Sequence, residues 1–150
     1  MSERLVSGWG IRTIAEGDGG YNPLGYHSGT VWPHDNSFIV AGLRRYGYAD
    51  EAARLSFAIL EAATFFGSRL PEAFAGYSRQ LTGVPVEYPK ASSPQAWASG
   101  APLLLLRTIL GLEPGDNGLL TDPVLPIGIE SLHLEGVHGR SNAGVGESRR

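Results

Sequence analysis

Residues 50–67, DEAARLSFAILEAATFFG, decide the fold class of this chain because they predict an amphipathic α-helix. Apolar side chains recur at intervals of three and four residues, at Ala52, Leu55, Ile59, Ala62 and Phe66. This spacing places them on one helix face, which has to be buried against other elements. We expect Asp50 to act as the N-cap and Gly67 to end the helix.

A second helix is expected just before this one, from Trp32-Pro33 to Gly47. Proline is favoured at the first position of a helix, and glycine is favoured just past its end. Because the connection to residue 50 is very short, the two helices should lie antiparallel as a hairpin.

A third helix is expected from Pro94 to Leu110, with Ser93 as its N-cap. Its run of four leucines at 103–106 is apolar all round, which predicts burial on more than one side. Pro102 in the interior should kink the helix or shift its hydrogen bonding.

The remaining segments predict long loops and short strands around a mainly α fold. Gly and Pro gather in the connections at 8–29 and 67–94, and structureless loops of that length are usually functional. Residues 124–127 and 132–134 have the character of short strands. The Gly- and Ser-rich residues 136–150 predict a disordered tail, which leaves 1–135 as the folded part.

Composition excludes several classes of function. The net charge is -3, and the 12 Lys and Arg residues are scattered rather than gathered in a basic stripe, which argues against nucleic-acid binding. With no Cys there are no disulfides or thiolate metal sites, and no segment approaches the ~20 apolar residues of a membrane span. We therefore expect a cytoplasmic protein that binds neither nucleic acid nor membrane and uses no cofactor.

Residues 26–36, YHSGTVWPHDN, combine aromatic rings with short polar groups just before an apolar run. This mixture is typical of a pocket wall, where rings stack on a ligand and polar groups hold it. His27 and His34 have no third metal ligand at a recognisable spacing, so a metal is not expected; they either bind hydroxyl groups or are structural. Asp35, in the first helical turn, is either a functional carboxylate or a simple stabiliser of the helix end.

Glu72 lies in a loop between Pro71 and Phe74, where apolar and aromatic neighbours help a carboxylate to hold or exchange a proton. The alternative is an ordinary solvated loop residue. Gln95 and Trp97 stand at the mouth of the third helix, and Trp97 is either part of a ligand site or part of the core. Carboxylates, rings and amides without a phosphate loop or nucleophile motif indicate sugar chemistry.

Four segments in order carry a resemblance to a known family: 7–13 (SGWGIRT), 21–36 (YNPLGYHSGTVWPHDN), 70–76 (LPEAFAG) and 94–97 (PQAW). They resemble the C-terminal part of the catalytic domain of bacterial glycogen-debranching, amylo-α-1,6-glucosidase-like proteins. The resemblance implies an (α/α)6 toroid of the glucoamylase kind and an α-glucan or oligosaccharide as substrate. It matches Glu72 to the general base of an inverting hydrolysis. The positions that it implies for the sugar pocket are Tyr26, His27, Trp32, His34, Asp35, Gln95 and Trp97.

The chain departs from this family in size, because such a toroid needs twelve helices and the sequence predicts about three. The general acid of the family lies in the earlier half of the barrel. The resemblance therefore implies a C-terminal portion that is inactive alone, although Asp35 is a nearby carboxylate. An alternative is a non-catalytic carbohydrate-binding or assembly module that associates through exposed helix faces. A small helical protein of unrelated function is the third interpretation.

Overall fold

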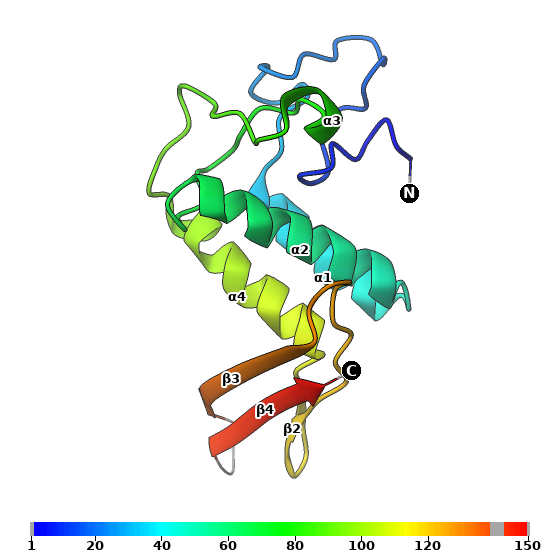
Figure 1. Ribbon diagram of the computed structural model, residues 1–150, viewed down its shortest axis with the longest axis vertical. Helices are drawn as coiled ribbons and strands as arrows, with labels where there is room; N and C mark the ends of the chain where they lie inside the picture. Colours follow the sequence, from blue (N-terminus) through cyan, green and yellow to red (C-terminus); the bar gives the residue numbers. More distant parts are fainter. Residues whose placement is uncertain (1, 139–142, 150) are drawn as a thin grey trace.

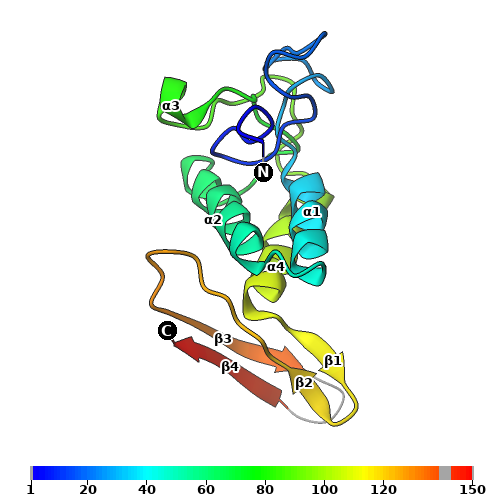
Figure 2. The same cartoon turned by 90° about the vertical axis from the view of Figure 1, so that its right-hand side faces the viewer.

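Three helices pack against one another between a layer of loops at one end of the molecule and two β-hairpins at the other (Figure 1). They are α1 (Pro33–Arg45), α2 (Ala49–Phe65) and α4 (Ala96–Leu110); the short α3 (Arg79–Thr82) lies in the loop layer. The computed structural model describes residues 2–138 and 143–149. The view turned by 90° shows the same three levels (Figure 2). The protein is mainly helical, as the sequence predicts, and the four helices of the described residues do not close a ring of twelve.

The α1–α2 hairpin confirms the predicted antiparallel pair. Trp32 has extended backbone angles (φ -108°, ψ 110°) and Pro33 is the first helical residue. Gly47 has a φ of 88°, a left-handed value that glycine adopts without strain, and it turns the chain between the helices. The turn is so tight that α2 begins at Ala49 after Tyr48, so Asp50 is not the N-cap. Asp50 lies in the first turn, where the helix dipole still stabilises a carboxylate.

Helix α4 begins two residues later than predicted. Gln95, rather than Ser93, is the N-cap, and its side-chain oxygen accepts a hydrogen bond from the backbone N–H of Ala98 (2.9 Å). The helix continues without a break through Pro102. Pro102 lies in the seventh position of α4, where its ring removes only one backbone donor.

Burial of α4 is one-sided, which corrects the expectation that its leucine run is covered on several sides. Leu105 and Ile109 are buried towards α1 and α2, whereas Leu103 is 72% exposed. Only two helices are available to pack against α4 in the described residues, so part of its apolar surface stays in contact with solvent.

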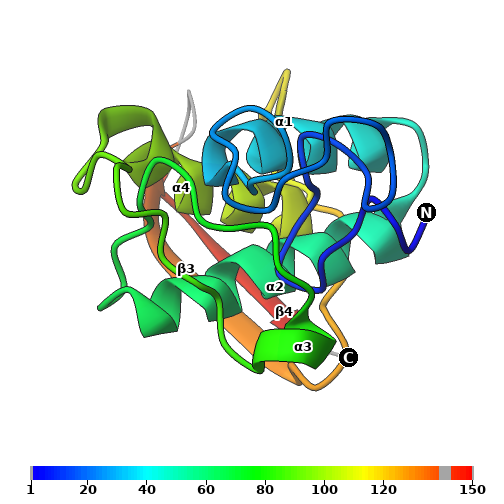
Figure 3. The ribbon, with the colours of Figure 1, turned by 90° about the horizontal axis from the view of Figure 1, so that it is seen from above.

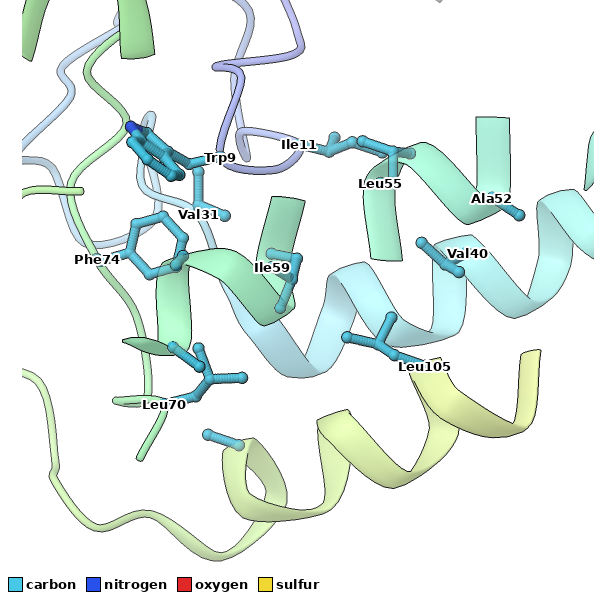
Figure 4. Packing of buried hydrophobic residues seen from close by; sticks show 13 residues of the cluster. Trp9, Ile11, Val31, Val40, Ala52, Leu55, Ile59, Leu70, Phe74 and Leu105 are labelled. Atoms are coloured by element: carbon cyan, nitrogen blue, oxygen red, sulfur yellow. The ribbon is translucent and has the colours of Figure 1, made fainter. Parts of the chain in front are cut away.

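The core is continuous from the helices into the loop layer (Figure 4). Leu55, Ile59 and Leu105 fill the space between the helices, and Trp9 and Phe74 close the loop end. The Trp9 ring meets the edge of Phe65 with centroids 5.5 Å apart, and the Arg79 guanidinium lies 4.1 Å from the Trp9 ring centroid. The loops therefore contribute apolar side chains to the core and are not a loose cover.

Isolated β-bridges tie the long loops together. They join Val6 to Ile11, Arg12 to Val31, Val31 to Phe74, and Phe74 to Glu87. Four segments that are distant in sequence thus become neighbours above the helices, as the view from above shows (Figure 3). At one close approach, a Cβ added to Gly76 would meet the Gly29 carbonyl oxygen at 1.7 Å, so only glycine fits there.

One buried side chain, Asn36 of α1, attaches this loop layer to the helices. Its Oδ1 accepts the backbone N–H of Ile11 (2.7 Å), and its Nδ2 donates to the carbonyls of Ile11 (3.1 Å) and Trp32 (2.9 Å). Asn36 is 1% exposed, so these bonds replace water for both backbone groups of Ile11.

The C-terminal region holds two antiparallel hairpins. Strand β1 (Glu113–Gly115) pairs with β2 (Gly118–Leu120), and β3 (Ser131–His138) pairs with β4 (Ala143–Arg149). The predicted strand at 132–134 is confirmed within β3. The strand predicted at 124–127 does not form, because the Val124 N–H bonds the Ile109 carbonyl at the end of α4 and Leu125 is buried.

The segment expected to be a disordered tail contributes to the second hairpin. Residues 136–138 belong to β3 and Ala143–Arg149 forms β4, while residues 139–142 and 150 lie outside the described residues. Gly136 has a φ of 76° at an irregularity in the register between Leu134 and Val137. Glycine and serine leave an unfolded chain with high conformational entropy, which is why the sequence predicts disorder here. Paired strands, however, are held by hydrogen bonds between backbone groups, and small side chains do not prevent these bonds. None of the described helices is long and apolar enough to cross a membrane.

Replacing Asn36 by Ala should lower the free energy of unfolding by roughly 2–4 kcal/mol, because two buried backbone groups of Ile11 lose their partner. Chemical denaturation monitored by circular dichroism measures this. The control is Asn22→Ala, which removes one exposed hydrogen bond to the Leu24 N–H (3.0 Å) and should cost less than about 1 kcal/mol. Equal effects of the two substitutions would contradict the anchoring role of Asn36.

Candidate functional site

Aromatic side chains gather where the loop at 26–31 leads into α1. The Tyr26 ring centroid lies 4.5 Å from that of His27, 4.8 Å from that of Trp32 and 5.6 Å from that of Tyr88. His27 stacks nearly parallel on Trp32 at 5.4 Å, with an interplanar angle of 8°. We call these four residues, Tyr26, His27, Trp32 and Tyr88, the Tyr26 cluster.

Hydrogen bonds within the loop fix the cluster. The Trp32 indole N–H donates to the Tyr26 carbonyl (3.1 Å) and lies 2.9 Å from the Thr30 hydroxyl oxygen, and the Thr30 hydroxyl donates to the same carbonyl (2.6 Å). Trp32 is only 7% exposed, and its polar group is used inside the protein. Trp32 therefore lies on the buried side of Tyr26 and His27. The half-buried Tyr26 and the exposed His27 are in contact with solvent.

Glu72 lies against this cluster because of the β-bridge between Val31 and Phe74. Its backbone N–H donates to the Ser92 carbonyl (3.0 Å), and the Ser92 N–H donates to Glu72 Oε2 (3.4 Å). Burial raises the pKa of the Tyr26 hydroxyl, and the nearby Glu72 carboxylate raises it further because its negative charge opposes ionisation of the phenol.

Residues at the starts of α1 and α4 form a second aromatic group. His34 stacks on Trp97 with centroids 4.4 Å apart and an angle of 23°, and meets the edge of Phe38 at 5.1 Å. His34 Nδ1 is 3.2 Å from Asp35 Oδ1. We call His34, Asp35, Phe38 and Trp97 the His34 cluster. Trp97 is 49% exposed, so it is a surface side chain and not part of the core.

The eight residues singled out in the sequence thus fall into three sets. Glu72 joins Tyr26, His27 and Trp32, and His34 and Asp35 join Trp97. Gln95 stands apart from both clusters in its contacts, because its side-chain oxygen caps α4. The Gln95 side-chain oxygen therefore stabilises the start of α4.

Sequence reasoning missed Tyr88 and the backbone of Ser92. Both lie in the long connection at 67–94, which the sequence marks only as a functional loop. The bridge from Phe74 to Glu87 and the pairing of Glu72 with Ser92 carry this segment back to the site. The aromatic residue of the EYP motif at 87–89 was the available signal, but its partner across the loop layer cannot be read from local sequence.

The hollows found among the described residues are not lined by Glu72 or the Tyr26 cluster, and one of about 730 Å³ between α1 and α4 is lined by residues that include Phe38. One of about 550 Å³ is lined by residues that include Arg12, Glu16 and Arg79, and one of about 490 Å³ by residues that include Tyr21 and Tyr77. Arg12, Glu16 and Arg79 there already form ion pairs, since Arg12 is 3.1 Å from Glu16 and Arg79 binds Glu61. We place the candidate site at Glu72 because its carboxylate lies beside aromatic surfaces that face solvent. No set of three potential metal ligands occurs among the residues that the structure describes.

Comparison with known proteins gives one partial similarity. No family model matches the chain. A mannosylglycerate hydrolase of Rubrobacter radiotolerans is 49% identical over 41 residues, which make up 27% of this chain and 9% of that protein. The chain is therefore similar over a short stretch to a hydrolase, and the similarity covers less than a tenth of that hydrolase. It gives no indication of glycogen debranching.

Gln95→Ala should destabilise the protein by about 1 kcal/mol, because the Ala98 N–H loses its capping acceptor. Gln95→Ser should restore most of the loss, since a serine hydroxyl also caps a helix. Thermal unfolding of the three proteins measures the effect. An unchanged stability in Gln95→Ala, combined with weaker sugar binding in both variants, would instead assign Gln95 to the ligand.

Proposed function

We propose that this chain is part of a glycoside hydrolase and that Glu72 is its general base. The observation that carries the proposal is the β-bridge between Val31 and Phe74, which brings Glu72 near the Tyr26 cluster, where its charge raises the pKa of Tyr26. Glycosidases place a carboxylate beside rings that hold the sugar, and an inverting enzyme uses that carboxylate to take a proton from the attacking water. The similarity to a mannosylglycerate hydrolase supports the same class of reaction.

In such a site, each of these residues would have a different role. Glu72 Oε1 or Oε2 accepts a proton of the attacking water, while the faces of Tyr26 and His27 contact the apolar face of the sugar ring. His34 and Trp97 provide a second aromatic surface for a further part of the substrate. The described contact of Asp35 is with His34, so we propose that the general acid is supplied by another part of the hydrolase.

The sugar and its linkage belong to the same proposal. The family resemblance favours an α-glucosidic linkage of a glycogen-like glucan, whereas the short stretch of identity is with a protein whose name gives mannosylglycerate as its substrate. The two alternatives differ in the sugar that the Tyr26 cluster would hold, so both are included in the test.

Glycosyl fluorides separate the base from the missing acid, because fluoride leaves without protonation. We expect the chain to release fluoride from α-glucosyl or α-mannosyl fluoride, and to leave maltotriose and mannosylglycerate intact. Glu72→Gln should lower the rate of fluoride release by about 10²–10⁴-fold, since general-base catalysis has that magnitude. A fluoride electrode and stopped sugar assays measure both reactions.

The matched control is Glu87→Gln, which changes an exposed carboxylate in the neighbouring bridged segment and should leave the rate unaltered. An equal rate in Glu72→Gln and the unsubstituted chain would refute the role of Glu72. Hydrolysis of maltotriose that depends on Glu72 would show instead that an acid is present in this chain.

A second candidate function is assembly through exposed helix faces with a second copy of the chain. Its specific support is the exposure of apolar side chains on α1 and α4, where Phe38 is 62% exposed and Leu103 is 72% exposed. Helices α1 and α4 pack against each other, and exposed apolar side chains that gather into a patch mark an interaction site.

If these faces join two copies, Leu103→Glu should convert a dimer to a monomer, because the substitution would bury a charge without a partner. Light scattering across a range of concentrations measures the mass. Glu51→Gln, on α2, is the control and should leave the mass unchanged. A monomeric unsubstituted chain at high concentration would rule out this second function.

A further inference from the structure

We propose that the hollow of about 490 Å³ between the loop at 16–23 and the start of α3 binds a sugar unit of a neutral oligosaccharide. Two tyrosine rings, a proline and a leucine line it together with a carboxylate, a hydroxyl and an amide. Neither Glu72 nor the Tyr26 cluster lines this hollow, so the site is additional to the candidate site described above. Its volume lies within the ~300–1,000 Å³ of small-molecule sites.

The first support is that the ring of Tyr21 is held in place. Its hydroxyl donates to the Gly76 carbonyl (3.1 Å), and the Arg12 guanidinium lies over the ring, 5.8 Å from its centroid. Arg12 is 3% exposed and its Nε donates to the same carbonyl (2.6 Å), so a buried cation supports the ring. A Cβ added to Gly29 would lie 2.9 Å from Tyr21 Cε2, so glycine makes room for the ring there. A ring fixed in this way loses little side-chain entropy when a ligand binds.

The second support is a set of polar groups that the fold leaves available. Within the described part of the chain, the Tyr77 hydroxyl and the Gln80 side-chain amide have no hydrogen-bond partner. Ser78 Oγ accepts a hydrogen bond from the backbone N–H of Gln80 (3.2 Å), which leaves the hydroxyl proton of Ser78 to donate. Glu16 meets Arg12 through Oε2 (3.1 Å), which leaves Oε1 as an acceptor. Sugar hydroxyl groups both donate and accept, so they match all of these groups.

The charge of the lining favours a neutral ligand. Glu16 is the only charged side chain among the described residues that line the hollow. A phosphate or carboxylate is held best by Arg or Lys side chains, and neither lines this hollow.

The same carboxylate argues against a proline-rich peptide, the other ligand that docks on aromatic rings. Such a peptide presents backbone carbonyls, and the ionised Glu16 has no proton to donate to them. A sugar unit offers a ring face to the tyrosines and hydroxyl protons to Glu16, so it meets both requirements.

The chain places this hollow near the proposed general base. Residues 72–77 connect Glu72 to Tyr77, and five residues span at most ~18 Å even when fully extended. A glucan held in the hollow by one unit therefore stays close to the candidate site, which raises the local concentration of its other units there. This role rests on the proposed function, whereas the binding of a sugar in the hollow does not.

The six tyrosines of the chain report on binding separately, because they fall into three pairs. Two line the hollow, two belong to the Tyr26 cluster and two are exposed at the turn between α1 and α2: Tyr21 and Tyr77, Tyr26 and Tyr88, and Tyr46 and Tyr48. NMR of protein labelled at the tyrosine ζ-carbon follows all six during titration with maltotriose and, separately, with mannotriose. Substitution of each tyrosine by phenylalanine assigns its signal. We expect the two signals of the hollow to shift and saturate together with at least one of these sugars, and those of Tyr46 and Tyr48 to stay unchanged.

Two substitutions test the lining. Gln80→Ala removes an exposed amide, so the fold should be retained, as thermal unfolding checks. We expect it to weaken binding at the hollow roughly 3- to 10-fold, the effect of one lost hydrogen bond. Tyr77→Ala should abolish saturation at Tyr21, because it removes one of the two rings. The matched control is Tyr46→Ala, at a tyrosine that is 82% exposed, and it should leave binding at the hollow unaltered.

The outcomes separate this site from the proposed function. Saturation at Tyr21 and Tyr77 without release of fluoride from the glycosyl fluorides would refute the function and leave the sugar site in place. Fluoride release without these shifts would overturn the sugar site alone. Equal shifts of all six tyrosines would also overturn it, because the sugars would then be touching the surface at random. Saturation with a proline-rich peptide and with neither sugar would assign the hollow to a peptide and overturn the proposal.

Discussion

The side-chain amide of Asn36 is the interaction on which the loop layer depends. An amide carries a donor and an acceptor side by side, so it can satisfy the N–H and the carbonyl of one residue as a neighbouring strand would. Asn36, the fourth residue of α1, does this for Ile11 in a place closed to water. Aspartate or leucine of similar size would leave one or both backbone groups unpaired, which is costly when buried. Asn36 therefore fixes the position of residue 11 of the loop layer relative to α1.

From this anchor, the position of Glu72 follows through backbone pairing. Arg12 follows Ile11 and bridges to Val31, and Val31 bridges to Phe74, two residues after Glu72. The buried Arg12 guanidinium strengthens the same connection, because it donates to the Gly76 carbonyl (2.6 Å). The carboxylate is thus tied to the helices by backbone and buried side-chain contacts and not by its own loop alone. Geometry of this kind is needed for a general base, since small displacements of a reacting group lower the rate.

Local sequence was sufficient for the helices and insufficient for what joins the loops. The spacing of Leu55 and Ile59, with Pro33 and Gly47 at helix ends, depends only on neighbours within a few residues, and these helices form where expected. Tyr88 lies more than 50 residues after Tyr26 in the chain and reaches it only through the bridges from Val31 to Phe74 and from Phe74 to Glu87. The strand expected at 124–127 failed for a similar reason, because its backbone bonds the end of α4 and finds no strand partner. Serine is favoured as an N-cap and glutamine is not, so the sequence predicts Ser93 as the cap of α4, and the capping role of Gln95 becomes visible only in the structure.

Because the Tyr26 cluster and the His34 cluster are exposed, the described residues by themselves do not enclose a bound sugar. A sugar held between a base and an acid needs walls on both of its faces, whereas Tyr26, His27 and Trp97 leave one side open to solvent. Water on that open side competes for the sugar hydroxyl groups and screens the charge of Glu72. Apolar side chains on α1 and α4, such as Phe38 and Leu103, are also exposed to solvent. A surface that covered the clusters would exclude this water, and Glu72, as the proposed base, would then act in a drier environment in which its charge has a larger effect.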